Sequence, residues 1–335
     1  MSYSMSTVRS AILAVALMLT LCVSAADTPE NRLITLRNNM ERSDSPLLRS
    51  HVLAQVADVD NFQAMMYAAA YLSDKAVART AAHTVAAIAA RHPEYNSQAM
   101  RDALTRALPL LKGKDKKQAK ALLRSLPTNV EGFVSIFNGR DLTGWKGLVQ
   151  NPIARRKMTS EQLASAQVKA DEQMRKDWKV EDGLLAYVGT GFDNICTVEQ
   201  YADFEMIVDW KLDPTGTEPD AGIYLRGTPQ VQIWDIARLN VGAQVGSGGL
   251  YNNTRHRSTP LCVADNRLGE WNTFLIRMVG DRVSVWLNGT QVVDNVVMEN
   301  YWDRSQPIFD CDQIELQAHG SKVYYRDIYV RRLGK

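Results

Sequence analysis

The feature that most constrains the fold is a change of hydrophobic period near residue 127. Before this point, apolar residues recur at helical spacing, as in Leu33, Leu36 and Met40. After it, short runs alternate apolar and polar side chains and are separated by Gly, Asp, Asn and Pro. That pattern is typical of β-sandwiches and jelly rolls. The sequence therefore predicts a multidomain chain, α then all-β, with a helical bundle followed by a β-sandwich.

One segment interrupts the β pattern. Residues 159–176 contain no Gly or Pro, and Thr159 is suited to cap a helix that begins there. We interpret the surrounding insertion either as a lid over a binding site or as a helix that caps an open end of the sandwich. The expected segments are a signal peptide over residues 1–26, a helical region over 27–126, a linker over 127–131, and a β domain over 132–335 with the helical insertion at 150–177.

The helical region consists of short helices joined by short turns, a style similar to a pair of HEAT-type repeats. His92-Pro93 is expected to end one of these helices, because the residue before a proline disfavours helix. Basic residues gather at the end of the region: Lys112, Lys114, Lys116, Lys117, Lys120 and Arg124. This cluster is either a docking surface for an acidic protein partner or a solvated helix face.

The first 26 residues have the form of an export signal. Arg9 is the only charge, an apolar run extends from residue 11 to 23, and small residues at 24–26 fit a cleavage site. Lipid attachment at Cys22 is the alternative, although Leu21 before it is larger than lipoprotein signals use. No other segment reaches the length of a membrane span. We therefore expect an exported, periplasmic protein without an integral membrane span.

Charge and cysteine content narrow the function classes. A formal net charge of +2 is too small to favour nucleic acid as the main partner. After removal of the signal, Cys196, Cys262 and Cys311 remain, so at most one internal disulfide can form. Their spacing fits no zinc site. We expect three buried thiols that pack as small hydrophobic groups.

Two strands of the β domain have further signatures. In residues 204–210, both alternating sets contain apolar side chains, which indicates a strand buried on both faces. Residues 282–288 alternate regularly, and Asn288-Gly289 is typical of a tight hairpin turn.

Three other strand segments place long polar and aromatic side chains on one face. Since alternate residues of a strand share a face, the apolar residues of 222–226, 230–234 and 314–319 form the core side. The opposite set consists of Tyr224, Arg226, Gln230, Gln232, Trp234, Glu315, Gln317 and His319. Amides that hydrogen-bond hydroxyls, beside aromatic planes, are suited to sugars. The alternative, a solvated sheet face, predicts more Lys and Thr than are present.

The β region resembles a known family on several motifs in order. These are GFVSIFNGRDLTGW at 132–145, WKVEDGLL at 178–185, AGIYLRG at 221–227, QVQIWD at 230–235, GGLY at 248–251, GEWNT at 269–273, WLNG at 286–289, IELQAHG at 314–320 and YRDI at 325–328. The region is similar to the 3-keto-disaccharide hydrolase domain, which has a concanavalin/laminin-G-like jelly roll, over about residues 131–333. The family often has Glu where this chain has Gln230, and the insertion marks a subgroup.

The resemblance implies cleavage of glycosides whose sugar is oxidised at C3. A base would remove the acidified C2 hydrogen, the C1 group would leave, and water would add to the unsaturated sugar. His319 is expected to be the base, because imidazole titrates near neutral pH, and Arg226 to stabilise the enolate. Tyr251 or Asp235 would protonate the leaving oxygen, although strand parity places Asp235 opposite Gln232. Substrate-orienting roles are expected for Tyr224, Gln230, Gln232, Glu315 and Gln317, and Trp234 is expected to stack on the sugar.

Several alternatives stay open at this stage. The same fold and face would serve a non-catalytic carbohydrate-binding module. An ordinary glycanase of this class would carry a Glu-x-Asp-x-x-Glu strand motif, which is absent. A protein-docking adaptor would rely on the helical region. A divalent cation such as Ca²⁺ is a further expectation, with Asp213, Glu218 and Asp220 as the acidic loop, although their spacing matches no standard calcium loop.

Overall fold

The computed structural model describes residues 28–334, so the expected signal, its cleavage site and Cys22 lie outside the described residues. The helical region begins at Thr28, whose side chain caps the first helix, and Asn61 and Ser97 cap later ones. The helix before His92-Pro93 ends at Arg91, as predicted. The helices are α2 (Pro29–Glu41), α3 (Pro46–Val56), α4 (Phe62–Ala70), α5 (Ala78–Arg91), α6 (Gln98–Ala107) and α7 (Gly113–Ser125). The likeness to HEAT repeats stays a prediction.

The β domain consists of two antiparallel sheets, as the period-two pattern predicted. Within the described residues, the larger sheet has the order β11-β10-β9-β6-β13-β4-β3, with β1 also paired to β13. Its strands are β1 (Val134–Ser135), β3 (Trp178–Glu181), β4 (Leu184–Tyr187), β6 (Phe204–Leu212), β9 (Asn272–Val279), β10 (Arg282–Leu287), β11 (Thr290–Val297) and β13 (Val323–Arg332). Asn288 and Gly289 form the turn between β10 and β11, as expected, and both have positive φ.

The smaller sheet has the order β2-β5-β12-β7-β8. Its strands are β2 (Trp145–Gly147), β5 (Ile195–Thr197), β7 (Asp220–Leu225), β8 (Thr228–Trp234) and β12 (Glu315–Leu316). The apolar sets predicted for these strands, among them Ile223, Ile233 and Leu316, are fully buried in the core between the sheets. The other face of this sheet therefore carries the predicted polar side chains.

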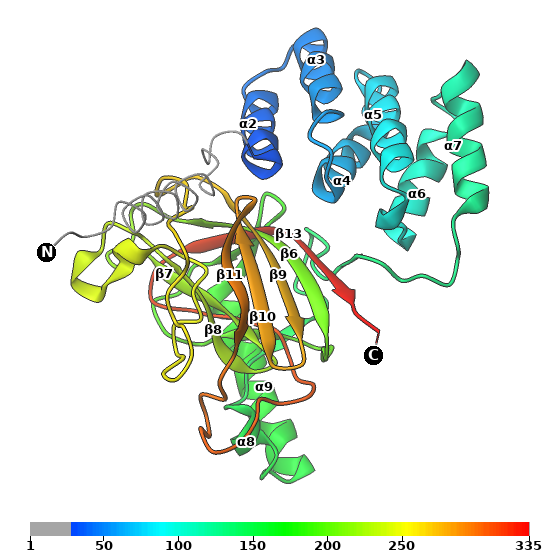
Figure 1. The fold of residues 1–335 in the computed structure, drawn as a ribbon. Coiled ribbons are helices and arrows are strands. Elements are labelled where there is room, and N and C mark those ends of the chain that lie inside the picture. Colours follow the sequence, from blue (N-terminus) through cyan, green and yellow to red (C-terminus); the bar gives the residue numbers. More distant parts are fainter. Residues whose placement is uncertain (1–27, 335) are drawn as a thin grey trace, which may run out of the picture.

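The insertion forms α8 (Pro152–Arg155) and α9 (Ser160–Asp177). Thr159 and Gln162 make a reciprocal capping box at the start of α9, as the sequence suggested. The helix lies directly against the edge strand β2, because a Cβ atom on Gly147 would be 2.1 Å from the carbonyl oxygen of Ala170. Figure 1 shows α8 and α9 on the side of the sandwich opposite to the N-terminal helices.

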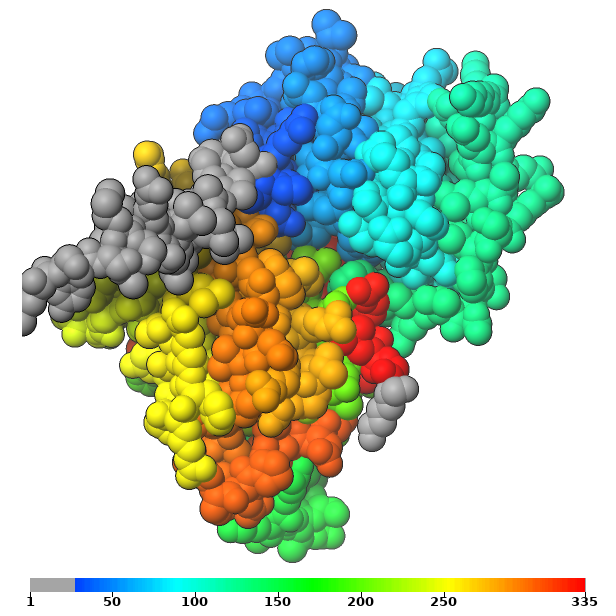
Figure 2. Space-filling view, in the orientation of Figure 1, coloured from blue at the N-terminus to red at the C-terminus, as the bar shows by residue number. Residues whose placement is uncertain are grey.

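The helical unit packs on the outer face of the larger sheet (Figures 1 and 2). Phe133 and Ile207 belong to the hydrophobic core of the helices, and Leu275 and Tyr329 pack against it. Strand β6 is thus buried on both faces, as predicted, with Phe204, Met206, Val208 and Trp210 in the core of the sandwich.

A buried carboxylate, Asp209, connects the helices to the sheet. It is 2% exposed, and it accepts hydrogen bonds from Gln63 Nε2 at 2.9 Å, Thr273 Oγ1 at 2.7 Å and Arg326 Nε at 3.0 Å. Arg37 of α2 lies 3.7 Å from Asp209 and also bonds the carboxylate of Asp327. Charges buried in this way are stable only while every partner is present.

Two further observations concern the chain as a whole. Cys196 is buried as expected, whereas Cys262 is half-buried and Cys311 is exposed, so the expectation of three buried thiols holds only for Cys196. Within residues 28–334, no helix is both long and apolar enough to cross a membrane.

Replacing Arg37 with Ala should lower the free energy of unfolding by about 3 kcal/mol, because it leaves buried carboxylates without a cation. Urea unfolding followed by circular dichroism measures this. Arg32→Ala is the matched control, since Arg32 forms an exposed pair with Asp58 at 3.8 Å and should cost about 0.5 kcal/mol or less. Equal losses in the two variants would contradict a stabilising role for the buried cluster.

Candidate functional site

A cavity of about 450 Å³ opens on the outer face of the smaller sheet, over β7, β8 and the end of β12. Polar and aromatic side chains from these strands form its floor, and loops supply its rim. Its lining consists of Glu218, Asp220, Tyr224, Pro229, Gln230, Gln232, Trp234, Arg238, Val241, Tyr251, Asn252, Tyr301, Trp302, Gln317 and His319. We call this cavity the cleft.

The centre of the floor is a glycine between two amides. A Cβ atom on Gly222 would lie 2.8 Å from Gln230 Cδ and 3.0 Å from Gln317 Oε1. Gly222 therefore gives the backbone of β7 room to lie between these side chains, and any larger residue would displace them. The floor at this position is peptide backbone flanked by amides.

A chain of hydrogen bonds fixes the amides of β8. Gln230 Nε2 donates to Gln232 Oε1, and Gln232 Nε2 donates to Asp220 Oδ1 at 2.8 Å. Arg238 Nη1 then donates to Asp220 Oδ2 at 3.3 Å. Gln230 and Gln232 are 5% and 2% exposed, so this part of the face is buried by the rim rather than solvated. Their orientation is set before any ligand arrives.

Two buried polar atoms in the cleft have no hydrogen-bond partner. They are Nδ1 of His319 and Oε1 of Gln317. Buried polar groups are normally satisfied, whereas these two atoms of cleft residues lack a partner within residues 28–334. Burial raises the pKa of the nearby Asp220 carboxyl, while the charge of His319 and the bond from Gln232 act to lower it.

Aromatic side chains form the rim and one wall. Trp234 is 6% exposed and donates its indole N–H to the carbonyl of Gly246 at 2.9 Å, so it is a fixed wall. Tyr251 is 49% exposed and meets Trp234 edge to face at 5.3 Å. Phe192 meets the ring of His319 edge to face at 5.2 Å. Phe192 is 69% exposed, so the accessible rings are those of Phe192 and Tyr251, and of these residues only Tyr251 carries a hydroxyl.

The structure brings together most of the residues predicted from the sequence. Those that line the cleft are Tyr224, Gln230, Gln232, Trp234, Tyr251, Gln317 and His319. Arg226, Asp235 and Glu315 do not line it.

Arg226 requires a correction, because it does not share the face of Tyr224. Strand β7 ends at Leu225, the pairing with β8 shifts register before that residue, and Arg226 has a φ of 50°. Its guanidinium donates to Asp203 Oδ1 at 2.6 Å and to the carbonyls of Ala202, Gly280 and Phe309. The side chain is 2% exposed, and its hydrogen bonds connect loops that do not line the cleft.

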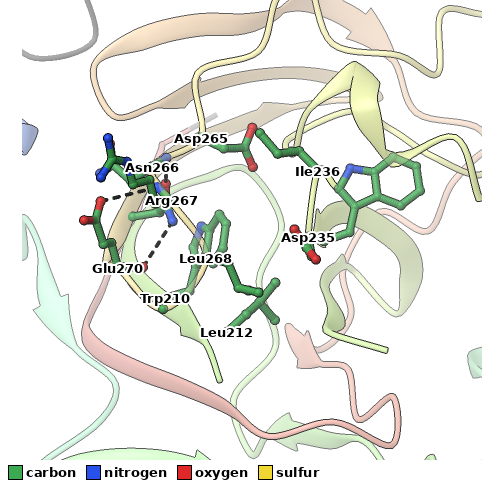
Figure 3. A pocket seen from close by; sticks show the side chains of 12 residues that line it. Trp210, Leu212, Asp235, Ile236, Asp265, Asn266, Arg267, Leu268 and Glu270 are labelled. Atoms are coloured by element: carbon green, nitrogen blue, oxygen red, sulfur yellow. Dashed lines mark hydrogen bonds between the residues drawn. The ribbon is translucent and has the colours of Figure 1, made fainter. Parts of the chain in front are cut away.

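Asp235 lies one residue beyond β8 and on the opposite parity from Gln232, as the alternation indicated. Figure 3 shows it in a separate cavity of about 20 Å³ with Trp210, Leu212 and Asp265. Its carboxylate accepts the backbone N–H of Ala237 at 3.0 Å. This position removes Asp235 from the groups that could protonate a leaving oxygen in the cleft.

Glu315 has the predicted face but is covered. It pairs across the sheet with Cys196 and Tyr224, is 1% exposed, and has Arg155 of the insertion at 3.9 Å. Within residues 28–334, neither carboxylate oxygen has a hydrogen-bond partner at normal geometry, and the side chain of Asn194 lies near enough to act to lower the pKa of Glu315. Burial raises the pKa of Glu315 to about 8, and the charge of Arg155 only partly opposes this. Glu315 is therefore largely protonated at neutral pH.

Two polar residues of the cleft were not among the catalytic candidates predicted from the sequence. Arg238 was not named, and Asp220 was assigned to a calcium-binding loop. Arg238 follows β8 in a loop, where strand parity gives no information. Asp220 has the same parity as Gly222 and Tyr224, so the alternation could have identified it. In the acidic loop expected to bind Ca²⁺, Asp213 is bonded to Thr215 and Asp220 to Gln232. Among residues 28–334 no group of three or more His, Cys or acidic side chains is placed to hold a metal, and the expected Ca²⁺ site stays a prediction.

Glu315→Gln should remove a pH dependence of folding. Because burial raises the pKa from the ordinary 4.5 to about 8, the folded protein holds a proton that the unfolded chain releases. Stability from this group is full below pH 4.5 and falls as the pH rises to 8. We therefore expect the free energy of unfolding of the variant, minus that of the parent, to be larger at pH 9 than at pH 5. Urea unfolding at the two pH values measures this difference. Glu172→Gln, at an exposed position of α9, is the control, and a parallel response of both variants would contradict the assignment.

Comparison with known proteins identifies the family of the β domain. The profile of the family described as the 3-keto-alpha-glucoside-1,2-lyase-like domain matches residues 132–331. A 3-keto-disaccharide hydrolase from Bacteroides thetaiotaomicron is 20% identical over 273 residues, which cover 66% of this chain and 85% of the relative.

Solved structures with a similar chain path include two carbohydrate-related proteins. One, provisionally assigned as a glycosyl hydrolase, comes from Parabacteroides distasonis, with 22% identity, coverage of 61% of this chain and 95% of that one, and a TM-score of 0.44. Carbohydrate binding module CBM66 from Bacillus subtilis has 11% identity, coverage of 57% and 97%, and a TM-score of 0.33. On the match over residues 132–331, the chain belongs to the family of 3-keto-alpha-glucoside-1,2-lyase-like domains.

Proposed function

We propose that this protein cleaves glycosides whose sugar carries a ketone at C3, by elimination followed by hydration. The observation that carries the proposal is that three residues, His319, Gln317 and Arg238, line one cleft, and that His319 Nδ1 and Gln317 Oε1 have no partner within residues 28–334. A base, a hydrogen-bond acceptor and a cation around one cavity are what an enolate-forming reaction requires.

The proposed reaction has two stages, elimination of the C1 group and addition of water. A C3 ketone acidifies the C2 hydrogen, His319 accepts that proton, and the electron pair passes into the enolate. The enolate then forms the C1–C2 double bond as the C1–O bond breaks, and the leaving oxygen takes a proton. Water adds its hydroxyl to C1 and its proton to C2. The sum is hydrolysis of the glycosidic bond without an oxocarbenium ion.

Each remaining role follows from position in the cleft. Arg238 replaces Arg226 as the cation for the enolate oxygen, since it lines the cleft and keeps donors beyond those held by Asp220 and Glu218. Tyr251 supplies the proton for the leaving oxygen from the exposed rim. The prearranged amides of Gln230, Gln232 and Gln317 orient the sugar hydroxyls.

The cellular setting is also a proposal. The sequence of residues 1–26 supports export to the periplasm, where soluble glycosides are accessible. The basic cluster on α7 supports docking of the helical unit to an acidic protein partner.

His319→Ala should reduce kcat for a 4-nitrophenyl 3-keto-glucoside by about 100-fold or more, because the general base is removed. Release of 4-nitrophenol from both anomers, and from the unoxidised parent glucosides, is the measurement. His256→Ala is the matched control, since His256 is exposed and bonded to Glu299 outside the cleft. Full turnover by His319→Ala would exclude His319 as the base, and cleavage of the unoxidised glucosides would favour a conventional glycosidase.

Arg238→Ala should lower kcat for the same substrate by about 100-fold, because the enolate loses a preorganised cation. A primary isotope effect with C2-deuterated substrate should accompany turnover in the parent protein. Arg255→Ala removes the same charge from an exposed loop and should leave kcat unchanged. If the deuterium effect is absent and both arginine variants match the parent, elimination through this cleft is wrong.

A further inference from the structure

A second cavity lies on the same outer face of the smaller sheet, at its β2 and β5 end beneath the insertion. Its volume is about 300 Å³. It is lined by Lys146, Val149, Pro152, Arg155, Arg156, Leu163, Gln167, Cys196, Gln200, Cys311, Asp312 and Gln313. None of these residues lines the cleft of His319. Lys146 lies on β2 and pairs with Cys196 on β5. Strands β12 and β7 lie between this pair and β8, which belongs to the cleft.

One residue of the lining, Gln313, carries a buried acceptor that has no partner within residues 28–334. Gln313 is 3% exposed, and its Oε1 atom has no hydrogen-bond partner. Its backbone is fully used, since its N–H meets Asp312 Oδ1 at 2.8 Å and its carbonyl accepts from Gly227 at 2.8 Å. The backbone of Gln313 is therefore fixed, and its side chain keeps an acceptor atom that no donor of the described residues satisfies. Such an atom needs a donor such as a hydroxyl group.

The cavity also has an excess of positive charge. Lys146, Arg155 and Arg156 line it against a single carboxylate, Asp312. Arg155 is committed to Asp312 at 2.9 Å, whereas Arg156 is 3.9 Å from that carboxylate and 58% exposed. Within residues 28–334, Lys146 takes part in no ion pair. Lys146 is therefore available to an anion. The Arg156 guanidinium lies over the Phe309 ring at 4.5 Å and meets Asp312 only at 3.9 Å, so this exposed group keeps donors for an anion.

The third feature of this cavity is an apolar wall. Val149, Pro152 and Leu163 line the same cavity and offer a surface to the C–H groups of a ring. A hydroxyl acceptor, two available cations and an apolar wall match a sugar that carries a carboxylate. We propose that this cavity is a second carbohydrate site, separate from the cleft of His319, and that it binds acidic sugars of the uronic acid class. The insertion supplies much of this site, which gives it a binding role in addition to its cover of β2.

Calorimetric titration with D-glucuronate tests this proposal on the full chain. The protein should bind glucuronate more tightly than D-glucose or acetate, because only glucuronate engages the cations and Gln313 together. Arg156→Ala and Lys146→Met should each weaken glucuronate binding by about tenfold, and Gln313→Leu should reduce the preference over acetate. Lys157→Ala is the matched control, since Lys157 is an exposed cation of the insertion outside the cavity.

Binding at the cleft is distinguished by His319→Ala and Gln232→Ala, which should leave glucuronate affinity unchanged. A loss of affinity in these two variants, with none in Arg156→Ala and Lys146→Met, would place the ligand in the cleft and overturn the proposal. Equal affinities for acetate and glucuronate would reduce the cavity to an anion site and also overturn it. No heat of binding at millimolar glucuronate, in protein shown to be folded by circular dichroism, would have the same consequence.

Discussion

The buried carboxylate of Asp209 is the contact on which the arrangement of the two units depends. It receives one donor from the helices, Gln63, and two from its own sheet, Thr273 and Arg326, with Arg37 of α2 close by. Buried ionic clusters contribute modest net stability but strongly penalise any arrangement that leaves one member unpaired. The cluster therefore specifies how the helices sit on the sheet, while the apolar contacts around Ile207 and Phe133 supply most of the favourable burial.

In this arrangement the two sheets of the sandwich are covered to different extents. The larger sheet is covered by the core on its inner face and by the helices over β6, β9 and β13 on its outer face. The smaller sheet is covered only in part, by the insertion at β2 and by rim loops at β8. The polar face that remains accessible is consequently confined between these covers. That confinement explains how Gln230 and Gln232 are buried although they point away from the core.

Strand parity predicted the fold class and much of the cleft from the sequence. It assigned Gln232, Gln317 and His319 to one face, because the alternation of side chains between the two faces of a strand is a local property of the backbone. It failed at Arg226, where the strand ends and φ becomes positive. It could not place Arg238, which reaches the cleft from a loop, nor show that Arg155 covers Glu315. Such contacts depend on packing between segments far apart in the chain, for which one sequence carries no periodic signal.

The position of α9 along β2 has a consequence for association between molecules. An uncovered edge strand presents unpaired backbone groups to any other strand, and so promotes aggregation. In this sheet α9 shields β2, with Gln167 Nε2 donating to the carbonyl of Gly147 at 2.8 Å. At the opposite edge, the backbone of Gly248 and Gly249 bonds to Gln232 of β8. Both edges of the sheet that carries the cleft are thus occupied, so this sheet is protected against pairing edge to edge with a strand of a second molecule.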